Sequence, residues 1–273
     1  MFSALANSSG EPDLARAPVS VLRPPSSDLR PPPPASLFPI IHEDDELLVI
    51  NKPAGLVCHP TKTDEYSSLI GRVRLYLGPD AQPQLINRLD RETSGVTVVV
   101  RNLSVARQLR RLWEERRVQK EYLAIVHGRL SQTHGTIDAP LGRDEHSLVA
   151  IKDCVRSDGA PAQTEYWVEK FLGRRPFTLL RVVPATGRKH QIRIHLAHIG
   201  HPIVGDKLYG GDESLYLAFV EGRLTEAQRQ TLVLPYHALH ASRLAFQWHA
   251  TEQIFVAPPE PWFGSFAALE GNQ

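Results

Sequence analysis

An aspartate between two arginines is the group in this chain best suited to chemistry. Asp90 lies between Arg88 and Arg91, ahead of a Thr-Ser-Gly turn signal and the apolar run Val96 to Val100. Nearby cations favour the charged form of an acid, so we expect Asp90 to be a carboxylate at neutral pH. A carboxylate held on a loop beside a rigid strand can act as a nucleophile or a base, and the arginines can hold an anionic ligand. A surface Arg–Asp network that only pins a turn is an equally good interpretation of these residues alone.

The hydrophobic pattern indicates which elements must position Asp90. The β-branched run Val96 to Val100 predicts a buried strand, and the following pattern predicts a helix capped by Ser104. Residues 118–126 alternate as in a strand, which places Lys120 and Tyr122 on one face. A strand tyrosine is more often part of a core than a catalyst, so the pattern alone gives Tyr122 no function.

A histidine-rich segment further along the chain could belong to a metal site or to a binding surface. It begins with Thr186-Gly187-Arg188-Lys189-His190-Gln191-Ile192-Arg193 and predicts a helix that ends before Pro202. The spacing of His195, His198 and His201 is i, i+3, i+6, which no helix presents as one tight cluster. The segment also lacks the His-Glu-x-x-His pattern of zinc enzymes. We therefore expect no bound metal, and we expect these histidines to cap, pair or contact phosphate.

The composition is that of a chain able to form one large folded domain. It has 273 residues, of which 42% are hydrophobic, enough to bury a sizeable core. No apolar run is long enough to span a bilayer, and no signal-peptide pattern follows Met1. Cys58 and Cys154 are the only cysteines, which argues against a disulfide framework and a cysteine-based zinc site. We expect a soluble, cytoplasmic protein.

The net charge of +1 conceals two strongly basic segments. Residues 86–120 contain eight arginines and one lysine against four acids, and residues 170–211 contain eight basic residues against Asp206 alone. If these segments meet in space, they form a positive face suited to a polyphosphate backbone. For part of the first segment we expect mainly solvent contact, because charge runs on a helix usually face water: Arg107, Arg110, Arg111 and Arg117.

Both ends of the chain are expected to lie outside the folded domain. Residues 1–38 contain eight of the 22 prolines, four of them in a row, and predict a disordered or polyproline-like tail. Residues 259–273 are expected to fray or to fold over the surface. The predicted folded domain therefore comprises residues 39–258.

Several stretches of this domain resemble motifs of the RluA-type pseudouridine synthase family. Arg88-Leu89-Asp90-Arg91-Glu92-Thr93-Ser94-Gly95 closely resembles the family signature, and Lys120-Glu121-Tyr122 and residues 186–210 resemble two further motifs. The segment Asn51-Lys52-Pro53-Ala54-Gly55 also resembles a family motif, although Lys52 is as well explained by a structural role as by phosphate contact. The resemblance implies an α+β fold in which residues 39–258 form the catalytic domain. It further implies a long mixed, mostly antiparallel sheet with flanking helices and a central basic cleft.

The resemblance also implies an activity, the isomerisation of specific uridines in structured ribosomal or transfer RNA. Asp90 would be the essential catalytic group, Tyr122 would lie over the uracil and assist proton transfer, and Arg193 would form a salt bridge with Asp90. The isomerisation involves no net redox change and no group donor, so we expect no cofactor. The chain shows no additional RNA-binding module, which makes a monomer plausible. The residues expected to bind RNA are Arg88, Arg91, Lys120, Arg188, Lys189 and His190.

Two other classes of protein are compatible with parts of this pattern. A catalytically silent RNA-binding protein would keep the basic face and tolerate the loss of Asp90. A metal-dependent hydrolase would use the histidine cluster and lose its activity with a chelator. The sequence also departs from the family pattern at Asn87, where a histidine is usual. We expect Asn87 to alter local hydrogen bonding or RNA choice rather than to abolish catalysis.

Overall fold

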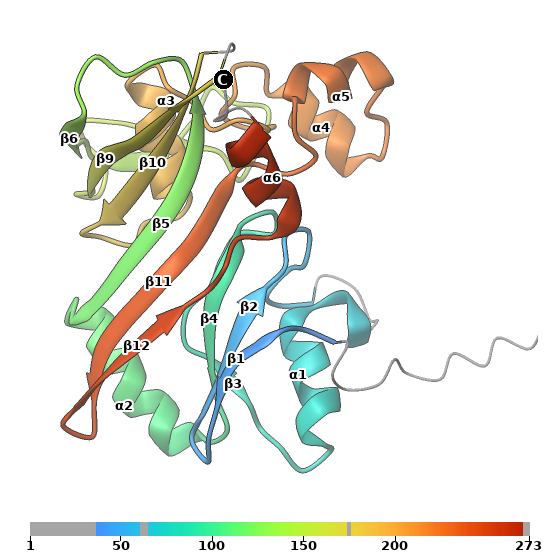
Figure 1. The fold of residues 1–273 in the computed structure, drawn as a ribbon. Helices are drawn as coiled ribbons and strands as arrows, with labels where there is room; N and C mark the ends of the chain where they lie inside the picture. The colour runs from blue at the N-terminus through green and yellow to red at the C-terminus, as the bar shows by residue number, and fades with distance from the viewer. Residues whose placement is uncertain (1–36, 61–64, 174–175, 270–273) are drawn as a thin grey trace, which may run out of the picture. The chain divides into compact units, whose positions relative to one another are not determined.

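A large mixed β-sheet dominates the computed structural model, which describes residues 37–60, 65–173 and 176–269 (Figure 1). Eight strands follow the order β1-β2-β4-β11-β5-β10-β9-β6, with β12 added beside β11 and β3 beside β4. Among the described residues, β4 and β11 pair in parallel and the other pairs of this sheet are antiparallel. The predicted α+β fold with a long, mostly antiparallel sheet is thereby confirmed. The strands are β1 (Ile40–Glu43), β2 (Leu47–Lys52), β3 (Gln84–Leu85), β4 (Ser94–Val100), β5 (Val118–His127), β6 (His134–Asp138), β9 (Gln163–Leu172), β10 (Phe177–Pro184), β11 (Leu239–Trp248) and β12 (Thr251–Val256).

The strand that follows Asp90 lies in the interior of this sheet, between β2 and β11. All seven residues of β4 are buried, as expected for a β-branched segment covered on both faces. Its parallel contact with β11 requires a glycine, because a Cβ at Gly95 would collide with the backbone of Ala241. Gly95 also has φ of 115°, which side chains rarely allow. The Asp90 loop is therefore followed at once by tightly packed, rigid backbone.

Two helices flank the first half of the sheet, α1 (Leu69–Leu77) and α2 (Leu103–Glu114), and a short 3₁₀ helix (Glu65–Ser67) precedes α1. The apolar face predicted for α2 is buried. Its cap was predicted wrongly, however, because the side chain of Asn102 and not that of Ser104 accepts the hydrogen bond from the Val105 amide, at 2.9 Å. No helix of the described residues is long and apolar enough to cross a membrane.

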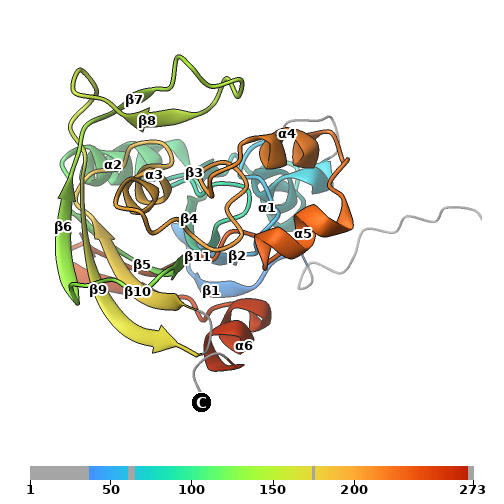
Figure 2. The same cartoon turned by 90° about the horizontal axis from the view of Figure 1, so that it is seen from above.

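The second half of the domain contributes the helix that carries Arg193. This helix, α3 (Gln191–His198), contacts β9, β10 and a separate two-stranded sheet of β7 (Leu141–Arg143) and β8 (Asp153–Val155). Figure 2 shows α3 between the main sheet and β7–β8. Two short helices follow, α4 (Ser214–Val220) and α5 (Glu226–Leu232). Between residues 128 and 162 the chain forms the short strands β6, β7 and β8, joined by loops.

Both predicted boundaries of the folded domain need correction. Leu37 and Phe38, placed in the N-terminal tail by composition, are each 4% exposed and belong to a core cluster with residues of β2 and α1. Residues 261–269, predicted as a tail, form helix α6 (Pro261–Leu269), whose Phe263 is 1% exposed. Both segments supply large apolar side chains that the sheet covers. The remainder of the predicted N-terminal tail, residues 1–36, lies outside the described residues.

Candidate active site

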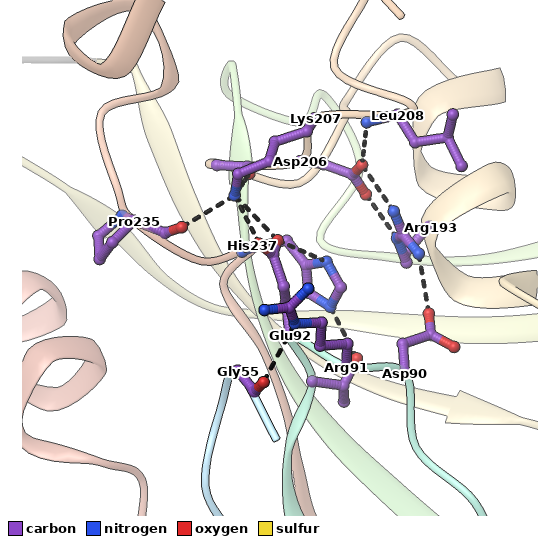
Figure 3. A network of polar contacts seen from close by, with 12 residues as sticks. Gly55, Asp90, Arg91, Glu92, Arg193, Asp206, Lys207, Leu208, Pro235 and His237 are labelled. Carbon is purple, nitrogen blue, oxygen red and sulfur yellow. Dashed lines mark hydrogen bonds and ion pairs between the residues drawn. The ribbon is translucent and has the colours of Figure 1, made fainter. Parts of the chain in front are cut away.

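The guanidinium of Arg193 holds two carboxylates from distant parts of the chain (Figure 3). Its Nη1 donates to Oδ2 of Asp90 at 2.8 Å, while Nε and Nη2 donate to the two carboxylate oxygens of Asp206 at 2.7 and 2.9 Å. The bond to Asp206 is a bidentate pair, the geometry that a planar guanidinium favours. Because Asp206 occupies one edge of the guanidinium, the remaining edge is fixed in the direction of Asp90.

Both carboxylates are held in the charged form. Burial of Asp90 favours the neutral acid, but the neighbouring Arg193 and His190 outweigh it and keep the pKa of Asp90 below its usual range. Burial acts in the same sense on Asp206, and the bidentate bond to Arg193 keeps the pKa of that carboxyl well below its usual range. Asp90 is therefore an anion at neutral pH, as its sequence context predicted.

A cavity of about 100 Å³ lies beside Asp90 and is named here the catalytic cavity. Arg88 and Lys120 come to it from one basic segment of the sequence, and Arg188, His190 and Arg193 come from the other. Tyr122 and Leu239 are among its apolar lining residues. The two basic segments therefore do meet in space, although only a few of their cations reach this cavity.

Tyr122 lies on the cavity-facing side of β5. Its burial, and then the negative charge of Asp90, raise the pKa of its phenol to about 12. The hydroxyl is consequently protonated at neutral pH and can donate a hydrogen bond, but it is a poor base in the unliganded protein. The structure thus brings Asp90, Tyr122 and Arg193 to one site.

His190 lies between Asp90 and a second tyrosine. Its Nδ1 is 2.8 Å from the hydroxyl oxygen of Tyr209, and its Nε2 is 3.8 Å from Oδ1 of Asp90. Burial lowers the pKa of His190, although the adjacent Asp90 raises it, so the imidazole is neutral at pH 7. The side chain is only 9% exposed, so the RNA contact predicted from the sequence is restricted to the part that lines the cavity.

Two predicted RNA-binding residues lie away from the catalytic cavity. Arg91 donates to the carbonyl of Gly55 at 3.1 Å, lies over the ring of Phe219, and lines a second cavity of about 160 Å³ on the other side of Asp90. Lys189 is half exposed and forms an ion pair with Asp153 at 3.0 Å. Neither residue lines the catalytic cavity, so an RNA would meet them outside it.

A second buried charge network lies behind Asp90 and was not predicted from the sequence. Nζ of Lys207 donates to both oxygens of Glu92 at 2.7 and 3.0 Å and to the carbonyl of Pro235 at 2.8 Å (Figure 3). His237 joins the network through its Nδ1, 3.6 Å from Oε2 of Glu92, while its Nε2 lies 2.7 Å from the Thr93 hydroxyl. The one available signal was the charged pair Asp206-Lys207 beside a histidine-rich motif, because charges next to a buried segment must find partners.

The backbone around Asp90 is held by side chains from the segment that precedes α1. Lys52 is fully buried, and its Nζ donates to the carbonyls of Pro53 and Leu56, each at 2.8 Å, and to that of Arg91 at 3.2 Å. Burial lowers the pKa of Lys52 to about 8. Of the two roles considered for Lys52, the geometry supports the structural one.

Asn87 fastens the same loop to the strand that follows it. Its side-chain amide donates to the carbonyl of Val96 at 3.0 Å, and its side-chain oxygen accepts from the amide of Val98 at 2.8 Å. Both hydrogen bonds go to backbone groups of β4, so the side chain satisfies these groups as a neighbouring strand would. Asn87 therefore has a local hydrogen-bonding role three residues before Asp90.

The histidine cluster is made of separately bonded side chains. His195 is fully buried, with Nδ1 2.9 Å from the Thr164 hydroxyl and Nε2 2.9 Å from the carbonyl of Ala139. His201 lies 2.9 Å from the carbonyl of His127 through its Nδ1. Within the described residues, no group of three or more histidines, cysteines and carboxylates could hold a metal ion.

Residues 46–198 match the family model described as RNA pseudouridylate synthase. The chain belongs to this family. The pseudouridylate synthase match includes Asp90, Tyr122 and Arg193, whereas Asp206 and Lys207 lie beyond its end. The family assignment made from the motifs is thereby confirmed.

Individual relatives carry the same family name. An uncharacterized RNA pseudouridine synthase of Aquifex aeolicus is 40% identical over 63% of this chain and 55% of its own length. Ribosomal large subunit pseudouridine synthase D of Xanthomonas campestris is 41% identical over 81% of this chain and 66% of its own length. The solved structure of human RNA pseudouridylate synthase domain containing 1 has a TM-score of 0.65 at 27% identity and covers 88% of this chain and 90% of that one. The chain spans only about half the length of the Aquifex relative and of a Haemophilus ducreyi relative.

Proposed function

We propose that this protein converts uridine to pseudouridine in RNA, with Asp90 as its essential catalytic group. The observation that carries the proposal is the Asp90 carboxylate, held at 2.8 Å by Arg193 and 30% exposed at a cavity shared with Tyr122. Membership of the pseudouridylate synthase family supports the same activity. An ionised carboxylate with one oxygen fixed by a buried cation and the other free toward a cavity is prepared for reaction.

The reaction breaks the N1–C1′ bond of uridine, rotates the detached uracil and forms a bond from C5 to C1′. A uridine inside a helix must first be flipped out, at a cost of a few kcal/mol. Arg88 is exposed at the mouth of the catalytic cavity, where it can fill the space that the base leaves. Asp90 then either attacks C1′ or removes the C2′ proton, and both routes require the ionised carboxylate.

Tyr122 and Arg193 have supporting roles in this proposal. Tyr122 packs on the uracil, and its protonated phenol donates a hydrogen bond where the base develops charge after the N1–C1′ bond breaks. Once C5 has bonded to C1′, the proton on C5 leaves to a base or to water and N1 takes up a proton, and the Tyr122 hydroxyl assists this exchange as a hydrogen-bond donor to the uracil. Arg193 orients Asp90 and keeps it ionised. Because the product is an isomer of the substrate, the chemistry needs neither a redox cofactor nor a group donor.

The proposed substrate is a structured ribosomal or transfer RNA, with large-subunit ribosomal RNA favoured. The support is that the relatives from Xanthomonas campestris and Haemophilus ducreyi are named for the large ribosomal subunit. We also propose that the protein acts in the cytoplasm as a monomer. Arg88, Lys120 and Arg188 around the catalytic cavity would contact the RNA, and Arg91 and Lys189 would contact it further out.

The decisive experiment maps pseudouridines in ribosomal and transfer RNA from cells with and without the gene. The expected result is the loss of one or a few pseudouridines, restored by the wild-type gene and not by the Asp90→Asn variant. A catalytically silent RNA-binding protein would leave the map unchanged while still binding RNA. Purified enzyme should keep its activity in the presence of a chelator, and inhibition by the chelator would favour the hydrolase alternative.

A further inference from the structure

A third cavity, distinct from the two cavities beside Asp90, lies next to the catalytic cavity and has no assigned role. It measures about 360 Å³ and is lined by residues that include His59, Arg74, Gln84, Arg88 and Arg110. The two cavities share Arg88. No carboxylate is among the described residues that line this space, which is named here the arginine cavity.

Within the part of the chain that the structure describes, no carboxylate pairs with the three arginines of this cavity. None of the ion pairs of the described residues involves Arg74, Arg88 or Arg110. Other arginines nearby do have such partners: Arg101 pairs with Glu43 and Arg111 with Glu115. Like charges gathered around one space repel one another, so the arrangement costs free energy unless an anion binds there.

One of the three cations, Arg110, is held in place, whereas Arg74 and Arg88 are exposed. Arg110 is half buried on α2, and its Nη2 donates to the side-chain oxygen of Gln84 at 3.0 Å. A guanidinium has five N–H donors, so most of those of Arg110 are left for a ligand. The field of the arginines is also felt by His59, whose pKa is lowered by burial and then by Arg88 and Arg74.

We propose that Arg74 and Arg110 bind phosphodiester groups of the RNA strand that flanks the flipped uridine. Arg88 lines both cavities, so a strand whose base enters the catalytic cavity continues past Arg88 into the arginine cavity. Phosphate contacts of this kind fix the register of a nucleic acid without reading its sequence. The inference rests on the proposed function, because it assumes that the flipped nucleotide belongs to an RNA chain.

This assignment separates Arg110 from its neighbours on α2. The sequence predicted solvent contact for all of the helix arginines, and that prediction fits Arg107, which is exposed, and Arg111, which pairs with Glu115. Arg110 instead faces the cavity. Arg74, in the last turn of α1, could alternatively serve only to complement the helix dipole. In that case its removal would lower stability slightly and leave RNA binding unchanged.

The test is the salt dependence of RNA binding by the full-length protein. The probe is an in vitro transcript of large-subunit ribosomal RNA from Xanthomonas campestris, and the variant is the double substitution Arg74→Gln and Arg110→Gln. The variant should bind about tenfold more weakly at fixed salt. Its plot of log affinity against log salt should be shallower by about 0.7 for each lost contact with single-stranded RNA, or about 1.4 for the pair.

The matched control is Arg107→Gln, which removes an exposed arginine from the same helix. It changes the net charge without touching the cavity, so its salt slope should equal that of the wild type. If Arg107→Gln reduced the salt slope by half as much as the double variant does, only overall charge would matter and the proposal would be overturned. Unchanged binding by the double variant, with circular dichroism showing a folded protein, would also overturn it.

A second measurement needs no substitution in the cavity. Phosphate bound beside His59 must raise the pKa of its imidazole, which a proton NMR titration with and without the RNA transcript can follow. An unchanged pKa in the RNA complex would contradict the proposal. Both measurements report binding and not turnover. They remain informative if the protein makes no pseudouridine, which would refute the proposed function instead.

Discussion

Arg193 holds two carboxylates that have opposite surroundings. The Asp206 side chain is 0% exposed and accepts two hydrogen bonds from Arg193 and further ones from the backbone amides of Leu208 and Tyr209. The Asp90 side chain is 30% exposed and accepts one hydrogen bond from Arg193, while its Oδ1 faces the cavities and His190. One carboxylate is saturated by the protein, and the other is left partly unsatisfied.

This difference separates a structural role from a reactive one. A buried ion pair is costly to break, because the remaining charge has lost both its partner and its water. A carboxylate at a cavity can be neutralised or bound by a substrate without such a cost. The region around residues 203–209 is therefore expected to maintain the fold and the direction of Arg193, and the loop around residue 90 to carry the chemistry.

The largest expected effect is the loss of activity in Asp90→Asn. The amide is nearly isosteric but cannot act as nucleophile or base, so the rate of pseudouridine formation should fall by about a thousandfold or more. The free energy of unfolding should change little, because the group is partly hydrated. Tritium release from RNA labelled at uridine C5 measures the rate, and urea denaturation measures the stability. Conversion that continues at the wild-type rate would refute the catalytic role of Asp90.

Asp206→Asn should lower the stability of the protein much more than Asp90→Asn does. It leaves Arg193 buried beside a neutral amide, and we expect a loss of about 3 to 5 kcal/mol in the free energy of unfolding. Activity should fall as well, since the guanidinium is no longer held toward Asp90. Urea denaturation is the measurement, and Asp80→Asn is the control at an exposed aspartate. A stability loss no larger than that of the control would remove the distinction drawn between the two carboxylates.

The free energy of unfolding should depend on pH through the buried imidazole of His237. Burial, and then the charge of Arg193, lower the pKa of His237 to about 3 from its ordinary value of 6.5. Between these values the unfolded chain takes up a proton and the folded protein does not. The stability due to His237 is therefore complete above pH 6.5 and is lost as the pH falls towards 3.

The expected loss from this histidine between about pH 7 and about pH 5 is about 2 kcal/mol. The other charged groups facing His237 are Glu92, Asp90, Asp206 and Lys207. Denaturation of the wild type and of His237→Gln at both pH values isolates the contribution of the imidazole. Gln has no proton to take up in this range, so the variant should show a smaller pH dependence. Equal pH dependence in the two proteins would show that another group is responsible.

The smallest effect is expected at Asn87. Asn87→Ala removes two hydrogen bonds to β4, and we expect a cost of about 1 to 2 kcal/mol in unfolding free energy and a reduction in rate of a few-fold. Asn87→His, which restores the usual family residue, should leave the activity within a few-fold of the wild type. The two rates are measured with the same RNA. If turnover required the histidine, the hypothesis that Asn87 is compatible with catalysis would be wrong.

Much of the fold followed from local patterns in the sequence. The β-branched run of β4 predicted a buried strand, the pattern after it predicted the helix α2, and the alternation of residues 118–126 predicted β5. Errors occurred at the ends of elements. The cap of α2 was displaced by two residues, from Ser104 to Asn102. Such details depend on which hydrogen bonds the final packing makes available.

The C-terminal helix α6 was missed for a different reason. Residues 261–269 have no clear polar face and include Gly264, so neither periodicity nor propensity predicted a helix. Phe263 and Phe266 nevertheless find apolar partners in the core cluster that contains Phe177. Tertiary burial stabilised a segment that its own sequence did not identify.

The sequence by itself determined the family, the identity of Asp90, Tyr122 and Arg193 as candidates, and the charge of the Asp90 carboxylate. These depend on residue types and on neighbours within a few positions. Only the tertiary structure showed that Arg193 is shared with Asp206, and that Arg110 faces a cavity while Arg107 does not. Arg193 and Asp90, for example, are more than a hundred residues apart in the sequence. No local pattern encodes which of the many charged side chains will meet once the core has formed.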